Sequence, residues 1–206
     1  MDTTAYGFET LQIVPDSLEA TFTARNGTTI HCRLIQPDDA PLLINLFSHL
    51  SAESRRRRFN LPLENIDHAR IVQEARRLAN VDNRTIGGAV LAFAPQETGE
   101  ELIAVARLGR FPAQPDSPDA EVALVVRDDF QGQGIGTALL AMLAPLARRM
   151  AVQTLTASVQ ADNEALYVLL RSLHLPAERH TSHGETTISL SVSDLPVSKR
   201  DDQIQG

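Results

Sequence analysis

Hydrophobic and polar residues follow two different periods along the chain, and the changes between them predict a mixed α/β fold. Apolar and polar residues alternate over Phe22–Arg25 and Thr28–Ile35, on either side of Asn26-Gly27. Alternation that flanks an Asn-Gly pair is a strong signal for a β-hairpin. Further strands are predicted at Ala89–Ala94, Leu102–Leu108, Val122–Val126, Leu155–Val159 and Thr186–Val192.

Four other segments have the period of a helix with one apolar face. Pro37-Asp38-Asp39 opens the first, whose apolar stripe consists of Leu42, Leu43, Leu46, Phe47 and Leu50. The others are predicted over Asn65–Leu78, 135–150 and 163–174. Pro145 lies inside the third of these helices and predicts a kink or an early end, because proline removes a helical hydrogen bond.

The order of these elements indicates an α/β protein with a mostly antiparallel central sheet. Two helices interrupt an antiparallel meander, which is followed by strand, loop, helix, strand, helix and strand. No repeat and no Pro/Gly/Ser-rich linker divides the chain, so we expect one domain over residues 20–192. Residues 1–19 are expected to form an extended arm or short strand, and the polar segment 193–206 a loose tail.

Composition restricts the classes of function. The 206 residues are 43% hydrophobic, which suits a globular domain, and no apolar run is long enough to span a bilayer. The net charge of −7 argues against nucleic acid as the main partner. No signal-peptide pattern is present, and Cys32, the single cysteine, excludes an internal disulfide framework, so we expect a cytoplasmic protein. The six histidines show no metal-site spacing, so no metal is expected.

The segment 121–140 carries the strongest chemical signal in the chain. Strand Val122–Val126 leads through a short polar turn into a glycine-rich loop, and that loop opens directly onto an apolar-periodic helix. A loop of this kind presents backbone N–H groups and the positive end of a helix dipole, which together bind phosphate. The alternative is a tight strand-to-helix turn in which Gly134 and Gly136 have only a conformational role.

Two common phosphate loops do not fit. A Walker loop ends in Gly-Lys-Ser/Thr, but Gly136 is followed by Thr137 with no lysine between them. A dinucleotide fingerprint needs a third glycine three residues after the second, and Thr137 occupies that position after Gly134. What remains is Gln131-x-x-Gly134-x-Gly136, which resembles the Gln/Arg-x-x-Gly-x-Gly/Ala signature of GNAT-type N-acetyltransferases.

The resemblance extends over about residues 20–192 and is greatest to the catalytic domain of bacterial Pat-type protein lysine acetyltransferases. It rests on Arg25–Thr29, on Leu50–Arg55 continuing to Arg58-Phe59, and on Ala120–Val122 continuing through Val126–Phe130. It implies a GNAT fold and acetyl-CoA as the co-substrate. The pyrophosphate would be bound by the loop and first helical turn, namely Gln131, Gly132, Gln133, Gly134, Ile135, Gly136 and Thr137.

The resemblance also implies two further contacts with acetyl-CoA. Main-chain groups of Leu124, Val125 and Val126 would pair with the pantetheine arm, as a ligand strand added to a splayed sheet. Asn163 matches a family position that often contacts CoA, although an asparagine at the start of a helix is equally explained as an N-cap.

Glu121 is the candidate general base. It lies ten positions before Gln131, as the base does in the protein-lysine branch of the family. A base is needed because an ammonium cannot attack a thioester before it loses a proton. The alternative is a solvated acid at the end of an acidic loop that contains Asp116 and Asp119.

The sequence departs from the family at the end of its last helix. Leu170 occupies the position of the tyrosine that commonly protonates the leaving thiolate, and Leu173-His174-Leu175 replaces the usual Leu-Gly-Phe. Tyr167 lies about one turn earlier, where packing explains it as well as catalysis does. Arg55–Arg58 resembles a solvated helix end in which one or two arginines are functional, because four consecutive residues cannot face one ligand.

We therefore expect an enzyme that transfers acetyl from acetyl-CoA to a primary amine by direct attack, with a protein lysine favoured as the acceptor. No ping-pong nucleophile is evident, because Cys32 is far from the loop in sequence and is expected to be a buried structural thiol. A small-molecule amine acetyltransferase and a non-catalytic acyl-CoA sensor remain alternatives. Both a monomer and a homodimer are compatible with the sequence.

Overall fold

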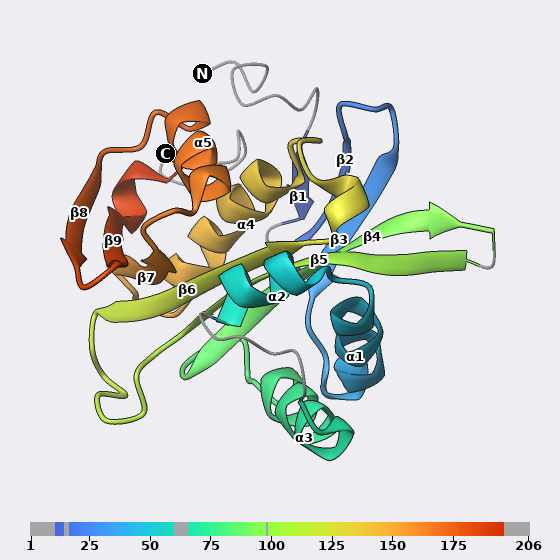
Figure 1. The fold of residues 1–206 in the computed structure, drawn as a ribbon, viewed down its shortest axis with the longest axis horizontal. Coiled ribbons are helices and arrows are strands. Elements are labelled where there is room, and N and C mark those ends of the chain that lie inside the picture. The colour runs from blue at the N-terminus through green and yellow to red at the C-terminus, as the bar shows by residue number, and fades with distance from the viewer. Residues whose placement is uncertain (1–10, 15–16, 60–65, 98, 196–206) are drawn as a thin grey trace.

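The computed structural model describes residues 11–14, 17–59, 66–97 and 99–195, and their strands form a single mixed sheet (Figure 1). The strand order is β1-β2-β3-β4-β5-β6-β7-β9-β8, and every neighbouring pair is antiparallel except β6 and β7. The strands are β1 (Gln12–Val14), β2 (Glu19–Thr23), β3 (Thr29–Leu34), β4 (Gly87–Gln96), β5 (Gly99–Gly109), β6 (Asp119–Val126), β7 (Thr154–Gln160), β8 (Ala177–Ser182) and β9 (Glu185–Ser191).

Five α-helices among the described residues flank this sheet. Figure 1 shows α1 and α3 on one side of the central strands, α4 and α5 on the other, and α2 in front of β6. Short 3₁₀ segments precede α1 and α4, at Pro37–Asp39 and Asp128–Phe130. The helices are α1 (Ala40–Ser48), α2 (Ala52–Phe59), α3 (His68–Ala79), α4 (Ile135–Arg149) and α5 (Glu164–Ser172).

The central strands bury both of their faces, which is why their sequences show long apolar runs. On β5, Ala104 and Ala106 belong to the core on the α4 side, whereas Val105 belongs to a second core with α1 and α3. The same alternation on β6 places Val122 and Leu124 on the α4 side. Glu121 therefore lies on the opposite face of the sheet from α4.

Strands β6 and β7 are paired along only part of their length, which leaves an opening in the sheet. Their parallel pairing joins Asp119 to Thr154, Ala120 to Leu155 and Glu121 to Thr156. Beyond Glu121, β6 continues to Val126 without a partner in β7, so one edge of its second half is open. This open edge runs from Glu121 toward the turn that precedes α4.

The structure contains one strand that the sequence did not predict, and it excludes an early end of the helix at Pro145. Residues 177–182 form β8, which the sequence did not predict because its residues are mostly exposed and show no apolar alternation. Helix α4 continues past Pro145 to Arg149. Leu146 and Met150, which follow the proline, are buried. Burial of each side chain stabilises the folded protein by about 1.5–3 kcal/mol, which is comparable with the roughly 3 kcal/mol that a proline inside a helix costs.

Ordered structure continues beyond residues 20 and 192, the expected ends of the domain. β1 pairs with β2, and Leu18 is buried, so part of the expected N-terminal arm belongs to the sheet. At the other end Leu195 is buried, although the segment was expected to be loose from Ser193 onward. Asn65, the expected start of α3, lies outside the described residues, as do 1–10 and 196–206.

His174 lies in the left-handed region, with φ of 51°, directly after α5. The N–H of His174 donates to the carbonyl of Arg171 at 3.1 Å, and that of Leu175 donates to the carbonyl of Leu170 at 3.4 Å. This is the Schellman pattern, which favours glycine at the left-handed position. It explains the glycine that the GNAT resemblance led us to expect there.

We expect His174→Gly to raise the free energy of unfolding by about 0.5–1 kcal/mol, because glycine adopts positive φ without steric cost. Urea denaturation measures this change. His180→Gly is the matched control, since His180 lies in β8 and has no positive φ. A loss of stability in both variants would contradict the assignment of strain to His174.

Candidate active site

The glycine-rich loop contains two backbone positions that favour glycine. Gly132 and Gly134 both have positive φ, 74° and 84°, and Gly134 is the N-cap of α4. A side chain at either position would be strained. The first N–H groups of a helix have no partner within it and carry its positive dipole end. The first turn of α4, which follows the loop, therefore has backbone N–H donors without partners inside the helix.

The turn between β2 and β3 is hydrogen-bonded to this loop through Arg25. The backbone N–H of Arg25 donates to the carbonyl of Gln133 at 3.1 Å, and Arg25 Nη1 donates to the carbonyl of Gly132 at 3.3 Å. These contacts engage the loop's carbonyl groups and bring a positive charge beside it. Sequence reasoning did not include Arg25 among the site residues, although its position next to the Asn26-Gly27 turn was a usable signal.

The side chain of Gln131 joins the loop to β6 and α2. Gln131 Nε2 donates to the carbonyl of Val126 at 3.0 Å and to Ser54 Oγ at 3.2 Å. Ser54 Oγ donates in turn to Asp128 at 2.8 Å, and Asp128 also accepts from Ser51. Gln131, the first residue of the loop signature, therefore connects the loop to β6 and α2 by hydrogen bonds.

The open edge of β6 presents main-chain groups next to the loop. Arg127 donates its N–H to the carbonyl of Ile103 in β5 at 2.8 Å. Because successive residues of a strand direct their amides to opposite edges, Leu124 and Val126 point theirs away from β5, toward the opening. The amide of Val125 points toward β5, with which Val125 pairs. Of the three residues predicted to pair with the pantetheine arm, only Leu124 and Val126 therefore have amides that point toward the opening.

The first turn of α4 packs closely against β6. A Cβ at Gly136 would lie 3.2 Å from Leu124 Cδ2, so the Leu124 side chain would have to shift by a few tenths of an ångström to admit it. Ile135 and Thr137 are buried on either side of this glycine. The close approach places the helix terminus beside the open strand edge.

Glu121 is exposed and lies near two arginines. It makes no ion pair with any described residue. Its negative charge acts on the guanidinium groups of Arg58 and Arg107. A carboxylate that is free of direct partners and open to solvent can accept a proton from an incoming group.

Cys32 is fully buried in β3, and burial raises the pKa of its thiol far above the ordinary value. A thiol that stays protonated is a poor nucleophile. No group of three or more His, Cys, Asp or Glu side chains among the described residues could hold a metal ion. Within the same residues, no helix is long and apolar enough to cross a membrane.

A family model described as the acetyltransferase (GNAT) family matches residues 47–174, more than half of the chain. The chain belongs to the GNAT acetyltransferase family. The match covers α2, the open strand β6, the glycine-rich loop and α4. The family and the mostly antiparallel fold that the sequence predicted are therefore confirmed, and acetyl-CoA is the co-substrate of this family.

Solved structures agree with this assignment. The GNAT domain of S. lividans PAT is 26% identical, with a TM-score of 0.71, over 84% of this chain and 96% of that domain. A cAMP-binding acyltransferase from Mycobacterium smegmatis is 24% identical, with a TM-score of 0.57, over 99% of this chain but 54% of that protein. The structure of yncA from Salmonella typhimurium with its cofactor acetyl-CoA is 18% identical, with a TM-score of 0.56, over 83% of this chain and 98% of that one.

The residues that depart from the GNAT pattern have structural roles here. Leu170, at the usual tyrosine position, is buried in the core. The Tyr167 hydroxyl donates to Thr186 at 3.4 Å, and its ring lies under Arg179. Asn163 caps α5 by accepting from the N–H of Leu166 at 3.2 Å. This cap uses the side-chain oxygen of Asn163, as expected of a helix N-cap.

Proposed function

We propose that this protein transfers the acetyl group of acetyl-CoA to a primary amine, with a protein lysine as the acceptor and Glu121 as the general base. The observation that carries the proposal is the placement of Glu121 on β6, the strand whose second half has an open edge and leads into the glycine-rich loop. One strand thus presents a free carboxylate, main-chain partners for an extended ligand arm and an anion-binding helix terminus.

The residues present fit acetyl-CoA. The pyrophosphate is bound by the N–H groups of the loop and the first turn of α4, where positive φ at Gly132 and Gly134 turns the backbone toward the ligand. The pantetheine arm pairs with Leu124 and Val126 at the open edge. Asn163 offers its amide nitrogen from the start of α5.

The transfer needs no covalent enzyme intermediate. Glu121 accepts one proton from the acceptor ammonium, and the neutral amine attacks the thioester carbonyl. The N–C bond forms, the C–S bond breaks, and the nitrogen releases its second proton. With Leu170 at the usual tyrosine position, the departing thiolate takes a proton from solvent. The buried thiol of Cys32 excludes that residue as an acyl carrier.

The test uses acetyl-CoA labelled in the acetyl group, the purified protein and a cell lysate, followed by acid precipitation. Label in precipitated protein, located on lysine by mass spectrometry, supports the proposal. Label only in a soluble product moves the acceptor to a small-molecule amine. Binding of acetyl-CoA without any transfer contradicts the proposal and favours an acyl-CoA sensor.

A further inference from the structure

Two arginines of different elements meet on the Glu121 face of the sheet. Arg107 lies on β5, and its Nη2 is 3.6 Å from the place a Cβ of Gly109 would occupy. Gly109 pairs with Glu121 across β5 and β6, so the guanidinium of Arg107 fills the space opposite Glu121. Arg58 reaches the same region from the last turn of α2. The positive charges of Arg58 and Arg107 act on each other.

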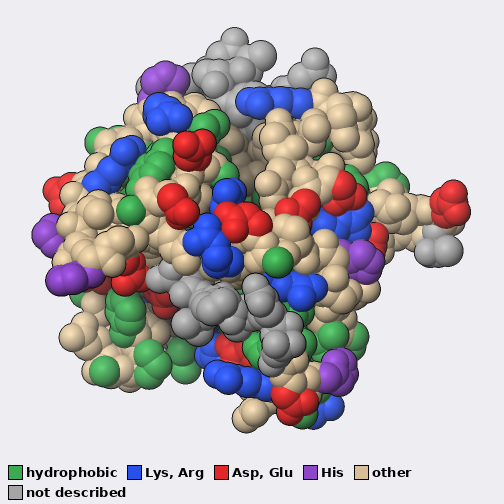
Figure 2. Space-filling view, in the orientation of Figure 1, with side chains coloured by type: hydrophobic (Ala, Val, Ile, Leu, Met, Phe, Trp, Pro, Cys, Tyr) green, Lys and Arg blue, Asp and Glu red, His purple; other side chains and the backbone are tan. Residues whose placement is uncertain are grey.

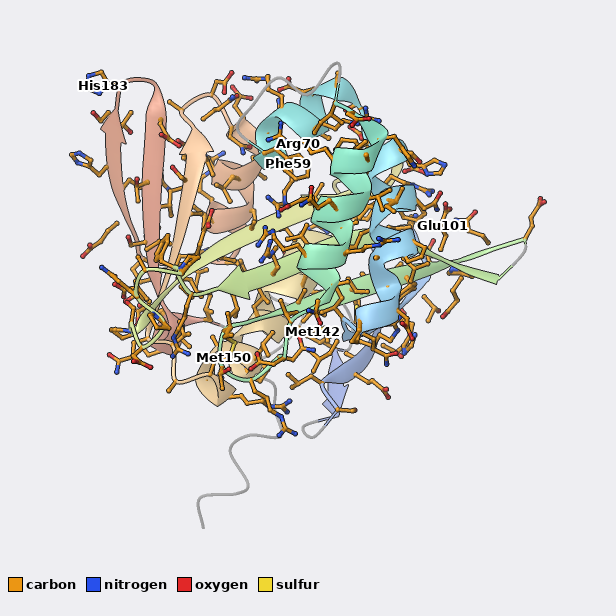
Figure 3. All side chains as sticks on the ribbon, turned by 90° about the horizontal axis from the view of Figure 1, so that it is seen from below. Phe59, Arg70, Glu101, Met142, Met150 and His183 are labelled. Atoms are coloured by element: carbon orange, nitrogen blue, oxygen red, sulfur yellow. The ribbon has the colours of Figure 1, made fainter. Side chains whose placement is uncertain are left out.

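Both arginines line one mainly apolar cavity between the sheet and the helices α1, α2 and α3. The cavity has a volume of about 60 Å³ and is lined by Leu43, Phe47, Phe59, Val105 and Val125, among others. It is several times larger than the space one water molecule requires, which is on the order of 10–15 Å³. Phe59, labelled in Figure 3, is the last residue of α2 and also lines the cavity.

Arg58 and Arg107 differ from the other half-buried or buried arginines in having no polar partner among the described residues. Arg33 binds Asp39 with two hydrogen bonds of 2.7 Å, and Arg127 binds both Asp129 and Glu101. Arg55, Arg56, Arg57 and Arg110 also donate to described oxygen atoms. The guanidinium carbon of Arg58 lies over the ring of Phe59, 5.0 Å from the ring centroid.

The unpaired arginines remain charged. Burial and the neighbouring Arg107 lower the pKa of Arg58 to about 10, and burial lowers that of Arg107. Arginine stays protonated in proteins, so both groups are charged at neutral pH. Glu74, the other acid near them, is already engaged by Arg77, whose Nε donates to it at 2.9 Å. A cavity with two guanidinium groups that have no polar partner among the described residues is complementary to an anion.

We propose that Arg58 and Arg107 bind a carboxylate of the acceptor, so that the substrate presents an amine to Glu121 and an acid to the arginine pair. This inference rests on the proposed acetyl transfer and specifies its acceptor as an amine that bears a neighbouring carboxylate. Guanidinium groups match the planar carboxylate and form two parallel hydrogen bonds with it. The carboxylate also offsets the repulsion between the arginines and the acceptor ammonium.

The experiment compares two pairs of acceptors that differ in one carboxylate. Free L-lysine is compared with 1,5-diaminopentane, and a blocked Gly-Glu-Lys-Gly peptide with its Gly-Gln-Lys-Gly counterpart. We expect wild type to favour the acidic member of one pair by about 10- to 100-fold in kcat/KM, as for a hydrogen-bonded ion pair. The pair that shows the preference identifies the source of the carboxylate, a free amino acid or an acidic residue beside a protein lysine.

Variants connect that preference to the arginines. Arg58→Gln and Arg107→Gln should reduce the preference to near unity, whereas Arg58→Lys, which keeps the charge, should retain part of it. Arg57→Gln is the matched control, because Arg57 lies on the same helix and pairs with Glu53 at 2.6 Å. Equal kcat/KM for both members of each pair in wild type overturns the inference while the proposed function stands.

Binding provides a readout that does not depend on turnover. In one of two product pairs, the acidic member should raise the Tm of wild type and of Arg57→Gln more than the neutral member does. The pairs are Nε-acetyl-lysine with N-acetyl-1,5-diaminopentane, and the Nε-acetylated Glu peptide with the Nε-acetylated Gln peptide. The difference should vanish in Arg58→Gln. If wild type acetylates none of the four acceptors, this comparison still decides the inference, and the lysate assay decides the proposed function. Equal Tm shifts in wild type from the two members of both product pairs would refute carboxylate binding.

Discussion

Replacing Glu121 by glutamine is expected to lower kcat for acetyl transfer by about 100- to 10,000-fold at neutral pH, the range typical of a lost general base. Glutamine keeps the size of the side chain but cannot accept the ammonium proton. Because Glu121 is exposed and makes no described ion pair, its loss should leave the fold intact. The Kd of acetyl-CoA, measured by calorimetry, should stay within about twofold of wild type.

Glu74→Gln is the control for this effect. Glu74 also acts on Arg107 through its charge, but it lies on α3 and is held by Arg77. If Glu121→Gln acted only by changing the electrostatic potential at Arg107, Glu74→Gln would lower the rate of acetyl transfer to a similar extent. A large loss in Glu121→Gln alone supports proton transfer. Retention of more than a tenth of the wild-type kcat in Glu121→Gln would contradict its role as the base.

The parts of the site that are continuous in sequence could be predicted before the structure. Val122–Val126, the glycine-rich loop and helix 135–150 follow one another directly, and each has its own local signal. The element order and the hairpin at Asn26-Gly27 were sufficient for the fold. These predictions depend on periodicity and turn chemistry, which short stretches of chain express by themselves.

The parts that depend on tertiary contacts could not be predicted in this way. Arg107 follows an apolar strand pattern, and nothing local indicates that its guanidinium lies opposite Glu121. Arg58 is the last of four arginines that look equivalent in sequence. In the structure, Arg56 and Arg57 pair with Glu53, whereas Arg58 lines the cavity. Figure 2 shows basic and acidic side chains interspersed over the face where α2 lies.

Gly134→Ala is expected to raise the Kd of acetyl-CoA about tenfold or more. The φ of 84° at Gly134 costs a residue with a Cβ about 1–2 kcal/mol. The loop relieves this strain by turning its N–H groups away from the pyrophosphate, so binding is weakened through the same donors that give the site its specificity. Calorimetric titration with acetyl-CoA measures the change.

Gly184→Ala separates this effect from a general loss of stability. Gly184 has nearly the same φ, 82°, and lies in the turn between β8 and β9, away from the glycine-rich loop. Both variants should lose a similar free energy of unfolding, because the intrinsic cost of positive φ is the same. Only Gly134→Ala should lose affinity for acetyl-CoA. If the two variants bind equally well, the glycines serve only to form the turn and the phosphate site lies elsewhere.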